Sequence, residues 1–461
     1  MQSITALSCF LHSFLRRIYR DFSSFRIYAI VIISLFLFTG LSGCSNSGGM
    51  EKSDVGKLSF ATDNGGITLP EGFKAVVVAD TIGAARHIAV RDNGDIYVAL
   101  RNPKNGGGIA AMRDTDGDGK ADVIKYFGEE GGTGIGIHDG YLYFSPDTAL
   151  YRYPLKEGQL VPSEPYQVVI SGFPVQHQHA PKTFTFDNNE NVYVNVGAPS
   201  NACQEQDRTK GSPGQDPCPL LKRHGGIWQF KANKLDQTQV DDGHRYATGI
   251  RNAVANAWKP DVSKLYILQH GRDQLHQLWP DLYTEEESAI LPAEEFFKVE
   301  DGDNFGWPFT YYDQVKGKKL LNPEYGGDGE KVGRAAQYEK PIMGFPGHWA
   351  PDGLLFYTGR QYPARFENGA FIAFHGSWNR APLPQAGYKI VYVPFDGEGP
   401  SDGYKTFADG FKGAETLDNP GDAKHRPVGL AQGPDGSLYV TDDQNGRIWR
   451  IVYTGEESDS M

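Results

Sequence analysis

Short stretches of alternating apolar and polar residues, each opened by a turn, recur along most of the chain. In each stretch an aromatic residue lies among β-branched or aliphatic neighbours, a pattern typical of half-buried strands. The six aromatic residues that mark the repeat are Tyr97, Tyr143, Tyr193, Tyr266, Phe371 and Tyr439. The closer of them recur at the ~40–50-residue spacing of one four-stranded propeller blade. The repeat therefore predicts an all-β, six-bladed β-propeller, whereas two separate β-sandwiches would not require one signature throughout.

The composition supports an all-β repeat protein. The 461 residues include 56 Gly, 28 Pro, 24 Tyr and 26 Phe, and 39% are hydrophobic. This apolar content excludes general disorder, and the dispersed Gly and Pro exclude collagen and long helical bundles. The formal net charge of −12 argues against a nucleic-acid partner, which would need a basic face.

The domain boundaries follow from the ends of the repeat and from its interruptions. We expect the propeller to span residues 67–455, followed by a disordered tail at 456–461. The wider gaps between repeats indicate loop insertions at 198–226 and at 281–345. The second insertion includes an acidic stretch, Tyr283 to Ala289, with a helical pattern. Long loops on a rigid scaffold are common places for functional sites.

The N-terminal 43 residues have the pattern of a secretory signal peptide. Arginines at 16, 17, 20 and 26 precede an apolar stretch over 27–41, which is shorter than the ~20 residues of a bilayer span. The stretch ends in Leu41-Ser42-Gly43-Cys44, which resembles a bacterial lipobox. We therefore expect cleavage before a lipidated Cys44 and a flexible tether over 44–66. The protein would then be anchored in the bacterial cell envelope, facing the periplasm or in the outer membrane. The alternative is a plain signal peptide in which Cys44 is incidental.

Cys203 and Cys218 are the cysteines of the globular part, and a Gly/Pro/Asp-rich loop separates them. In an oxidising compartment such a pair predicts a disulfide that closes the loop. A metal site is the other interpretation, although no second cysteine pair accompanies this one.

Two polar motifs lie at predicted loop-to-strand junctions. His179 precedes a Phe-rich strand, and its near-neutral pKa suits a general base that removes a hydroxyl proton. Arg251 and Asn252 place a cation beside an amide, which suits an anionic or quinone oxygen. The alternatives are a structural histidine in a turn, and a surface arginine beside a turn asparagine.

From about residue 70 to 453 the chain resembles the soluble quinoprotein sugar dehydrogenases, and within them the L-sorbosone and aldose dehydrogenase-like branch. The motifs that carry the resemblance are His177-Gln178-His179, Gly249-Ile250-Arg251-Asn252, Asp301-Gly302-Asp303-Asn304-Phe305-Gly306-Trp307-Pro308, His348-Trp349-Ala350-Pro351, Phe374-His375-Gly376-Ser377-Trp378-Asn379-Arg380 and Arg426-Pro427-Val428-Gly429-Leu430. The resemblance implies a six-bladed propeller that binds pyrroloquinoline quinone (PQQ) and Ca²⁺.

The resemblance also implies residue roles. His179 would be the base that takes the sugar C1 hydroxyl proton, and Arg251 would stabilise charge on the reduced quinone. The residues that would contact the cofactor are Arg86, Asn252, His348, Trp349, Trp378, Asn379, Arg380, Lys424 and Arg426. The backbone carbonyls of Gly271 and Arg272 would bind the catalytic Ca²⁺. Gln178 and Arg272 stand where the glucose-oxidising branch has Asp and Pro, which makes glucose itself a doubtful substrate.

A second calcium signal lies apart from these motifs. Residues 114–122 carry carboxylates at positions 1, 3, 5 and 9 of an EF-hand-like loop, namely Asp114, Asp116, Asp118 and Asp122. Position 12 is Lys125, and the flanks read as strands, so the loop is no EF-hand. It is either a structural Ca²⁺ loop or an Asp/Gly hairpin turn.

The leading hypothesis is therefore a PQQ- and Ca²⁺-dependent dehydrogenase of an aldose or related sugar. Because the sequence has no C-x-x-C-H haem motif, electrons would pass to a separate cytochrome or quinone. The alternatives are a calcium-dependent, lactonase-type propeller hydrolase and a propeller that binds without catalysis.

Overall fold

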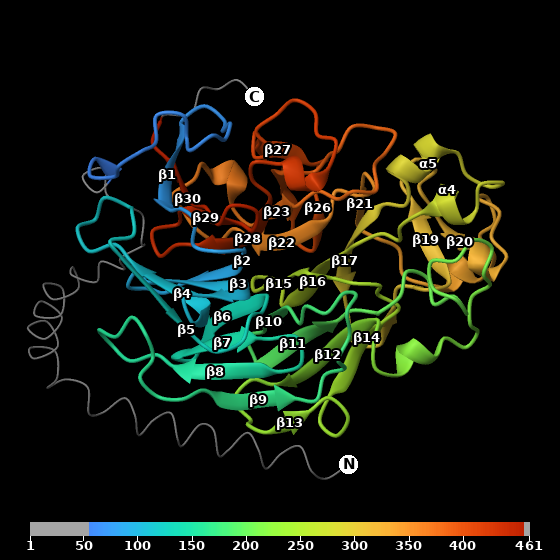
Figure 1. Ribbon diagram of the computed structural model, residues 1–461, viewed down its shortest axis with the longest axis horizontal. Helices are drawn as coiled ribbons and strands as arrows, with labels where there is room; N and C mark the ends of the chain where they lie inside the picture. The colour runs from blue at the N-terminus through green and yellow to red at the C-terminus, as the bar shows by residue number, and fades with distance from the viewer. Residues whose placement is uncertain (1–54, 456–461) are drawn as a thin grey trace, which may run out of the picture. The chain divides into compact units, whose positions relative to one another are not determined.

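The computed structural model describes residues 55–455, in which strands form six sheets of four or five strands and two short hairpins. Figure 1 shows the sheets arranged around a centre. The predicted signal peptide, Cys44 and the tail at 456–461 lie outside the described residues. No helix in the described part is long and apolar enough to cross a membrane.

The first three blades follow one another along the chain. Blade 1 contains β2 (Ala85–Val90), β3 (Ile96–Lys104), β4 (Gly107–Arg113) and β5 (Val123–Phe127). Blade 2 contains β6 (Gly134–His138), β7 (Tyr141–Ser145), β8 (Leu150–Pro154), β9 (Gln167–Ser171) and β13 (Gln237–Thr238). Blade 3 contains β10 (Phe184–Phe186), β11 (Asn191–Val196), β12 (Gly226–Lys231), β14 (His244–Thr248) and β18 (Asp303–Asn304).

The last three blades complete the ring. Blade 4 contains β15 (Ala255–Lys259), β16 (Lys264–Gln269), β17 (Glu294–Val299) and β21 (Met343–Phe345). Blade 5 contains β22 (Pro351–Phe356), β23 (Ala370–Phe374), β24 (Lys389–Val393) and β27 (Lys405–Ala408). Blade 6 contains β28 (Pro427–Gln432), β29 (Leu438–Asp442), β30 (Ile448–Tyr453) and the N-terminal strand β1 (Phe73–Ala79).

The ring is closed by contacts between the first strands of the blades. Strands β2, β6, β10, β15, β22 and β28 each contact the next, and β28 contacts β2. Strand β1 pairs antiparallel with β30, with Phe73 opposite Tyr453, so both ends of the described chain build blade 6. The predicted six-bladed propeller is confirmed.

The aromatic residues that mark the repeat occupy one position in the fold. Each lies in the second strand of its blade and is at most 4% exposed. A strand that is covered on both faces by neighbouring blades must be almost wholly apolar. Two of these buried tyrosine hydroxyls find partners in other segments: Tyr97 donates to the Leu160 carbonyl, and Tyr266 donates to the Glu398 carbonyl.

The insertions carry the short helices and hairpins. They include η1 (Pro219–Lys222), α4 (Leu275–Leu278), α5 (Glu285–Ile290), β19 (Thr310–Asp313), β20 (Lys318–Leu321), η2 (Pro323–Tyr325) and η3 (Gly333–Gln337). Further along lie η4 (Ala364–Phe366), β25 (Phe395–Asp396), β26 (Gly399–Pro400) and η5 (Pro420–Asp422). Thr284 caps α5 with a capping box, so the predicted helical stretch is present.

Two sequence-based expectations about loops are settled by the fold. Cys203 and Cys218 form a disulfide with their Cα atoms 6.2 Å apart, so the disulfide is confirmed and the metal interpretation is wrong. The described part of the predicted tether, 55–66, packs on the propeller, and it was wrong to expect flexibility there. Leu58 is buried at 8% exposure, and the Ala61 N–H donates to the Ala75 carbonyl.

Candidate active site

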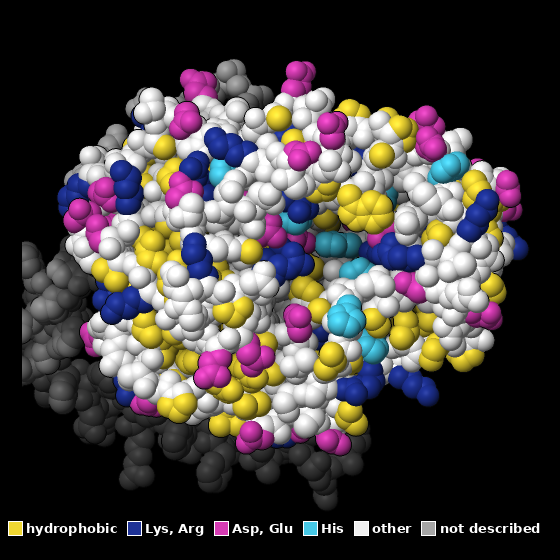
Figure 2. All heavy atoms as spheres, viewed as in Figure 1, with side chains coloured by type: hydrophobic (Ala, Val, Ile, Leu, Met, Phe, Trp, Pro, Cys, Tyr) yellow, Lys and Arg dark blue, Asp and Glu magenta, His cyan; other side chains and the backbone are white. Residues whose placement is uncertain are grey.

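A cavity of about 280 Å³ is lined by residues that lie near the starts of inner strands of several blades. Arg86 comes from β2, His179 from the segment before β10, and Arg251 from the segment before β15. Arg426 directly precedes β28. Figure 2 shows histidine and Lys/Arg side chains gathered near the middle of this face. Polar side chains far apart in sequence thus meet in one place.

Most of the predicted site residues line this cavity. They are Arg86, His179, Arg251, Asn252, Gly271, His348, Trp378, Asn379 and Arg426. The sequence motifs therefore predicted correctly that these positions meet in one place.

Two residues of the predicted cofactor and metal set have side chains that point into hydrophobic or ion-paired surroundings instead. Trp349 packs edge-on against Phe374, with ring centroids 5.2 Å apart. The Arg272 guanidinium is buried and pairs with Glu324 at 2.5 Å. Trp349 is not among the residues that line the cavity, because its ring packs in the hydrophobic surroundings instead. Arg272 was predicted to contribute its backbone carbonyl, and the ion pair of its side chain does not test that prediction.

Two further predicted cofactor ligands are also absent from the cavity lining. Arg380 donates to the carbonyls of Ala289 and Gly347, at 3.2 and 3.1 Å. Lys424 lies against Gly413, and its N–H donates to the Lys412 carbonyl. Both residues serve loop packing in this structure, so their predicted cofactor contacts are not supported.

His179 is held in one tautomer at the cavity wall. Its backbone has a φ of 54°, and its Nδ1 lies 2.5 Å from the carbonyl oxygen of Ala198. A carbonyl can only accept, so Nδ1 carries the proton and Nε2 is left as the basic nitrogen. Burial, and then the Arg251 charge, lower the pKa of His179 to about 3. The side chain is therefore neutral at physiological pH.

The backbone around His179 is fixed by neighbouring polar groups. Gln176 Nε2 donates to the carbonyls of Gln178 and His179, both at 2.8 Å, and to that of Gly197 at 3.0 Å. A Cβ at Gly197 would lie 2.7 Å from both His179 Cβ and Asn252 Oδ1. Only glycine at 197 thus permits this approach.

Arg251 is oriented by a buried carboxylate. Its Nη2 donates to Asp273 Oδ2 at 2.8 Å, and its Nη1 donates to the Gly271 carbonyl at 2.9 Å. Burial alone would raise the pKa of Asp273, but the guanidinium groups of Arg251 and Arg208 hold it well below its ordinary value. Asp273 is therefore an anion at neutral pH, and it fixes Arg251 by a charge-assisted contact.

A second ionic network surrounds Arg86. Its guanidinium donates to Asp443 at 2.8 Å and to Asp352 at 3.1 Å. His375 Nε2 lies 2.8 Å from Asp443, and Arg426 Nη2 donates to His375 Nδ1 at 2.9 Å. His375 thus links the Asp443 carboxylate to the Arg426 guanidinium.

Several cavity residues were missed by the sequence analysis. They are Arg101, His270, Asp273, Glu294, Asp352 and His375. His375 lies inside a motif that carried the resemblance. Asp273 directly follows the predicted metal position Arg272, and Asp352 directly follows the motif His348-Trp349-Ala350-Pro351. Arg101, near the end of β3, has no comparable signal in the sequence.

The cavity has cations that no carboxylate neutralises directly. Within residues 55–455 the Arg426 guanidinium donates to His375 and to the Gly376 carbonyl. In the same range the Arg101 side chain lines the cavity without a hydrogen bond or an ion pair. The Nε atoms of Arg86 and Arg251 are buried without a partner. This donor set suits an anionic, oxygen-rich ligand.

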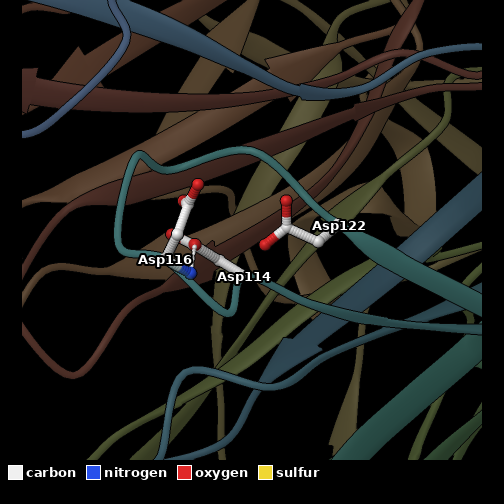
Figure 3. A group of neighbouring side chains, drawn as sticks. All are labelled: Asp114, Asp116 and Asp122. Carbon is white, nitrogen blue, oxygen red and sulfur yellow. Dashed lines mark hydrogen bonds between the residues drawn. The ribbon is translucent and has the colours of Figure 1, made fainter.

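The acidic loop is a separate feature, a connection between β4 and β5 (Figure 3). Carboxylate oxygens of Asp114, Asp116 and Asp122 lie within 4.8 Å of one another, whereas Asp118 is outside this group. Asp114 accepts from the N–H groups of Gly117 and Gly119, as in an Asp/Gly turn. Calcium binding at this loop stays a prediction.

The fold and the cavity define a six-bladed propeller with a central site rich in arginine and histidine. The chain belongs to the TrAA12-like family, whose model matches residues 67–454. The predicted family resemblance is confirmed at this level.

Relatives among characterised and uncharacterised proteins match parts of the chain. A protein of Borreliella burgdorferi, described as uncharacterised, is 32% identical over 208 residues, 45% of this chain and 48% of that protein. The "Pyrroloquinoline quinone-dependent pyranose dehydrogenase" of Coprinopsis cinerea is 25% identical over 279 residues, 52% of this chain and 36% of that protein. The matches thus span about half or less of these relatives.

Solved structures share the fold. The holo PQQ domain of pyranose dehydrogenase from Coprinopsis cinerea has a TM-score of 0.66 at 19% identity, covering 84% of this chain and 97% of that one. The calcium structure of the Trichoderma reesei family AA12 enzyme has a TM-score of 0.68 at 18% identity, covering 86% and 98%. The apo aldose sugar dehydrogenase of Escherichia coli gives 0.53 at 17% identity, covering 83% and 99%.

Proposed function

We propose that the protein is a PQQ-dependent dehydrogenase that oxidises an aldose or a related sugar. The single observation that carries the proposal is the convergence of His179, Arg251 and Arg426 in one cavity of a propeller of this family. The Coprinopsis cinerea relative, a PQQ-dependent pyranose dehydrogenase by name, supports the same chemistry.

The residues present fit a flat tricarboxylate. Arg101 and Arg426 face the cavity without a carboxylate partner among the described residues, and guanidinium groups bind carboxylates in a fork. Trp378, 56% exposed, adds an aromatic surface to the same cavity. A volume of about 280 Å³ is close to the lower end of the ~300–1,000 Å³ typical of small-molecule pockets.

The chain supplies a base and a positive charge for the oxidation. PQQ, when bound, supplies the quinone that accepts a hydride. His179 Nε2 takes the proton of the sugar hydroxyl, because Nδ1 is committed to the Ala198 carbonyl. A bound tricarboxylate would raise the low pKa of His179 and so make it a stronger base. The Arg251 charge stabilises negative charge that develops beside it.

A calcium ion at the cavity is the second part of the proposal. Of the two carbonyl residues predicted to bind it, Gly271 lines the cavity and Arg272 does not. The Gly271 carbonyl already accepts from Arg251 Nη1, so a cation would compete with that guanidinium for the oxygen. The Trichoderma reesei calcium structure motivates the test with and without Ca²⁺.

The lactonase alternative has less support. It requires acidic ligands that are free to converge on a metal. Glu294 accepts from the N–H groups of Gly271 and Ala350, Asp273 from Arg251, and Asp352 from Arg86. In the described part of the chain, the acidic group close enough for a metal is the β4–β5 loop instead.

The location and the electron acceptor extend the proposal beyond the described residues. The lipobox-like ending at Cys44 supports a lipid-anchored protein of the bacterial cell envelope. Electrons would then leave to a separate cytochrome or quinone. Dye-linked oxidation of a sugar panel by protein supplied with PQQ and Ca²⁺ tests the activity, and no activity under any of these conditions would refute it.

A further inference from the structure

The disulfide-closed loop reaches the carboxylate that orients Arg251. Arg208 lies between Cys203 and Cys218 in sequence. Its Nη2 donates to Asp273 Oδ2 at 2.9 Å, and Arg251 Nη2 donates to the same oxygen at 2.8 Å. Two guanidinium groups, one from the loop and one from the cavity, therefore share a single carboxylate oxygen.

Asp273 is fixed from further sides. Asn379 Nδ2 donates to its Oδ1 at 2.6 Å. Asn201 holds the backbone of Asp273 by donating to its carbonyl and accepting from its N–H, both at 2.9 Å. Charge-assisted hydrogen bonds in such a partly buried site are strong and directional. The placement of Arg251 consequently depends on how Asp273 is held.

The same guanidinium contacts the neighbour of the proposed base. Arg208 Nε donates to Gln178 Oε1 at 3.3 Å, and Nη1 donates to Gln274 Oε1 at 2.8 Å. Gln178 directly precedes His179. Arg208 thus links the segment that contains His179 to Asp273, the carboxylate that orients Arg251.

The loop around Arg208 is built to keep it in place. Arg208 has a φ of 54°, and its N–H donates to Gln204 Oε1 at 2.9 Å. Gln204 is 3% exposed, and its Nε2 donates to the Thr209 and Ser212 carbonyls. Arg208 is therefore held from inside the loop, and its position does not depend on the Asp273 contact alone.

We propose that Arg208 is a positioning residue, which holds Arg251 in its working place through Asp273 and makes the disulfide-closed loop part of the active site. This inference rests on the proposed function. With Arg208 present, the two guanidinium groups and one carboxylate carry a net positive charge. Without it, Asp273 pairs with Arg251 alone, and the charge available to the reaction is cancelled.

Steady-state kinetics of the PQQ-loaded full chain test the role. We expect Arg208→Gln to lower kcat about tenfold or more, with the sugar KM within about twofold, because a shifted cation costs rate more than binding. Arg208→Lys keeps the charge and should recover much of the loss. The control is Arg334→Gln, which removes an ion pair of 2.9 Å to Asp216 in the same loop. Unchanged kcat in Arg208→Gln, or an equal loss in Arg334→Gln, would overturn the proposal.

A second measurement does not require activity. A double-mutant cycle on urea unfolding of the PQQ-free protein compares Arg208→Gln, Arg251→Gln and the double variant. Residues that share a partner should couple, and we expect at least about a fivefold departure from additivity in the unfolding equilibrium constant. Additive effects would overturn the network. If the wild type binds no PQQ and oxidises no sugar, the proposed function fails, while the cycle still decides whether Arg208 and Arg251 are linked.

Discussion

His179 Nδ1 and the carbonyl oxygen of Ala198 lie 2.5 Å apart, and this contact assigns the basic nitrogen of the site to Nε2. It follows that an asparagine at 179 could keep a hydrogen bond near Ala198 but could not accept the substrate proton. We expect His179→Asn to lower kcat by about 10²–10⁴-fold, the usual contribution of a general base. PQQ binding, measured by titration, should change much less. A His179→Asn variant with near-wild-type kcat would remove His179 from the mechanism.

The tight approach of Gly197 to His179 gives a second prediction. In Gly197→Ala the new methyl group would meet His179 Cβ and Asn252 Oδ1 at 2.7 Å, so the base must move. We expect at least about a tenfold loss of kcat, since small displacements of reacting groups are costly. Gly399→Ala is the matched control, because a Cβ at Gly399 meets nothing within 4 Å. Equal activity of the two variants would contradict the assigned geometry.

Cavity arginines without an ion pair to a described carboxylate lead to a prediction about the affinity for PQQ. Arg101 lines the cavity without an ion pair among residues 55–455, so Arg101→Gln should weaken PQQ binding by about 10- to 100-fold, the value of one or two charge-assisted contacts. Stability should be nearly unchanged, because no internal partner is lost. Arg360→Gln, at an exposed arginine outside the cavity lining, serves as the comparison. If both variants bind PQQ equally well, Arg101 has no part in the site.

Two histidines with depressed pKa values predict how stability depends on pH. Burial lowers the pKa of His87 to about 4 and that of His179 to about 3, from an ordinary value near 6.5. Below pH 6.5 the unfolded chain binds protons that the folded protein does not, so stability present above that pH is lost as the pH falls. Urea unfolding of the PQQ-free protein should show a lower free energy of unfolding at pH 5 than at pH 7. The difference should shrink in His179→Asn, and an unchanged difference would contradict the assignment.

The architecture could be predicted from sequence because its signal is local and repeated. Tyr97, Tyr143 and Tyr193 recur at blade spacing, and each occupies the same second strand, where burial on both faces demands an apolar aromatic. The pairing of β1 with β30 has no such signal, since the contact joins opposite ends of the chain and is specified by backbone hydrogen bonds. Local alternation thus identifies blades but not the strand that closes the ring.

The site could be predicted in part, because sequence motifs indicate which positions lie near the starts of the inner strands. Motifs located Arg86, His179, Arg251 and Arg426 correctly, because each lies at or beside the start of an inner strand. The neighbouring Trp349 does not line the cavity, since the direction of its side chain is set by tertiary packing against Phe374. The carboxylates of Asp273 and Asp352 were missed because their partners come from distant parts of the sequence.

Titration of the purified protein with PQQ, with and without Ca²⁺, followed by absorbance, tests the central claim most directly. The account predicts tight, saturable binding of one PQQ per chain and weaker binding by Arg101→Gln. An oxidisable sugar should then cause a further absorbance change as it reduces the bound PQQ, and an electron-accepting dye should reverse that further change. A titration without saturation, or binding that is equal in wild type and in a variant lacking both Arg101 and Arg426, would contradict it.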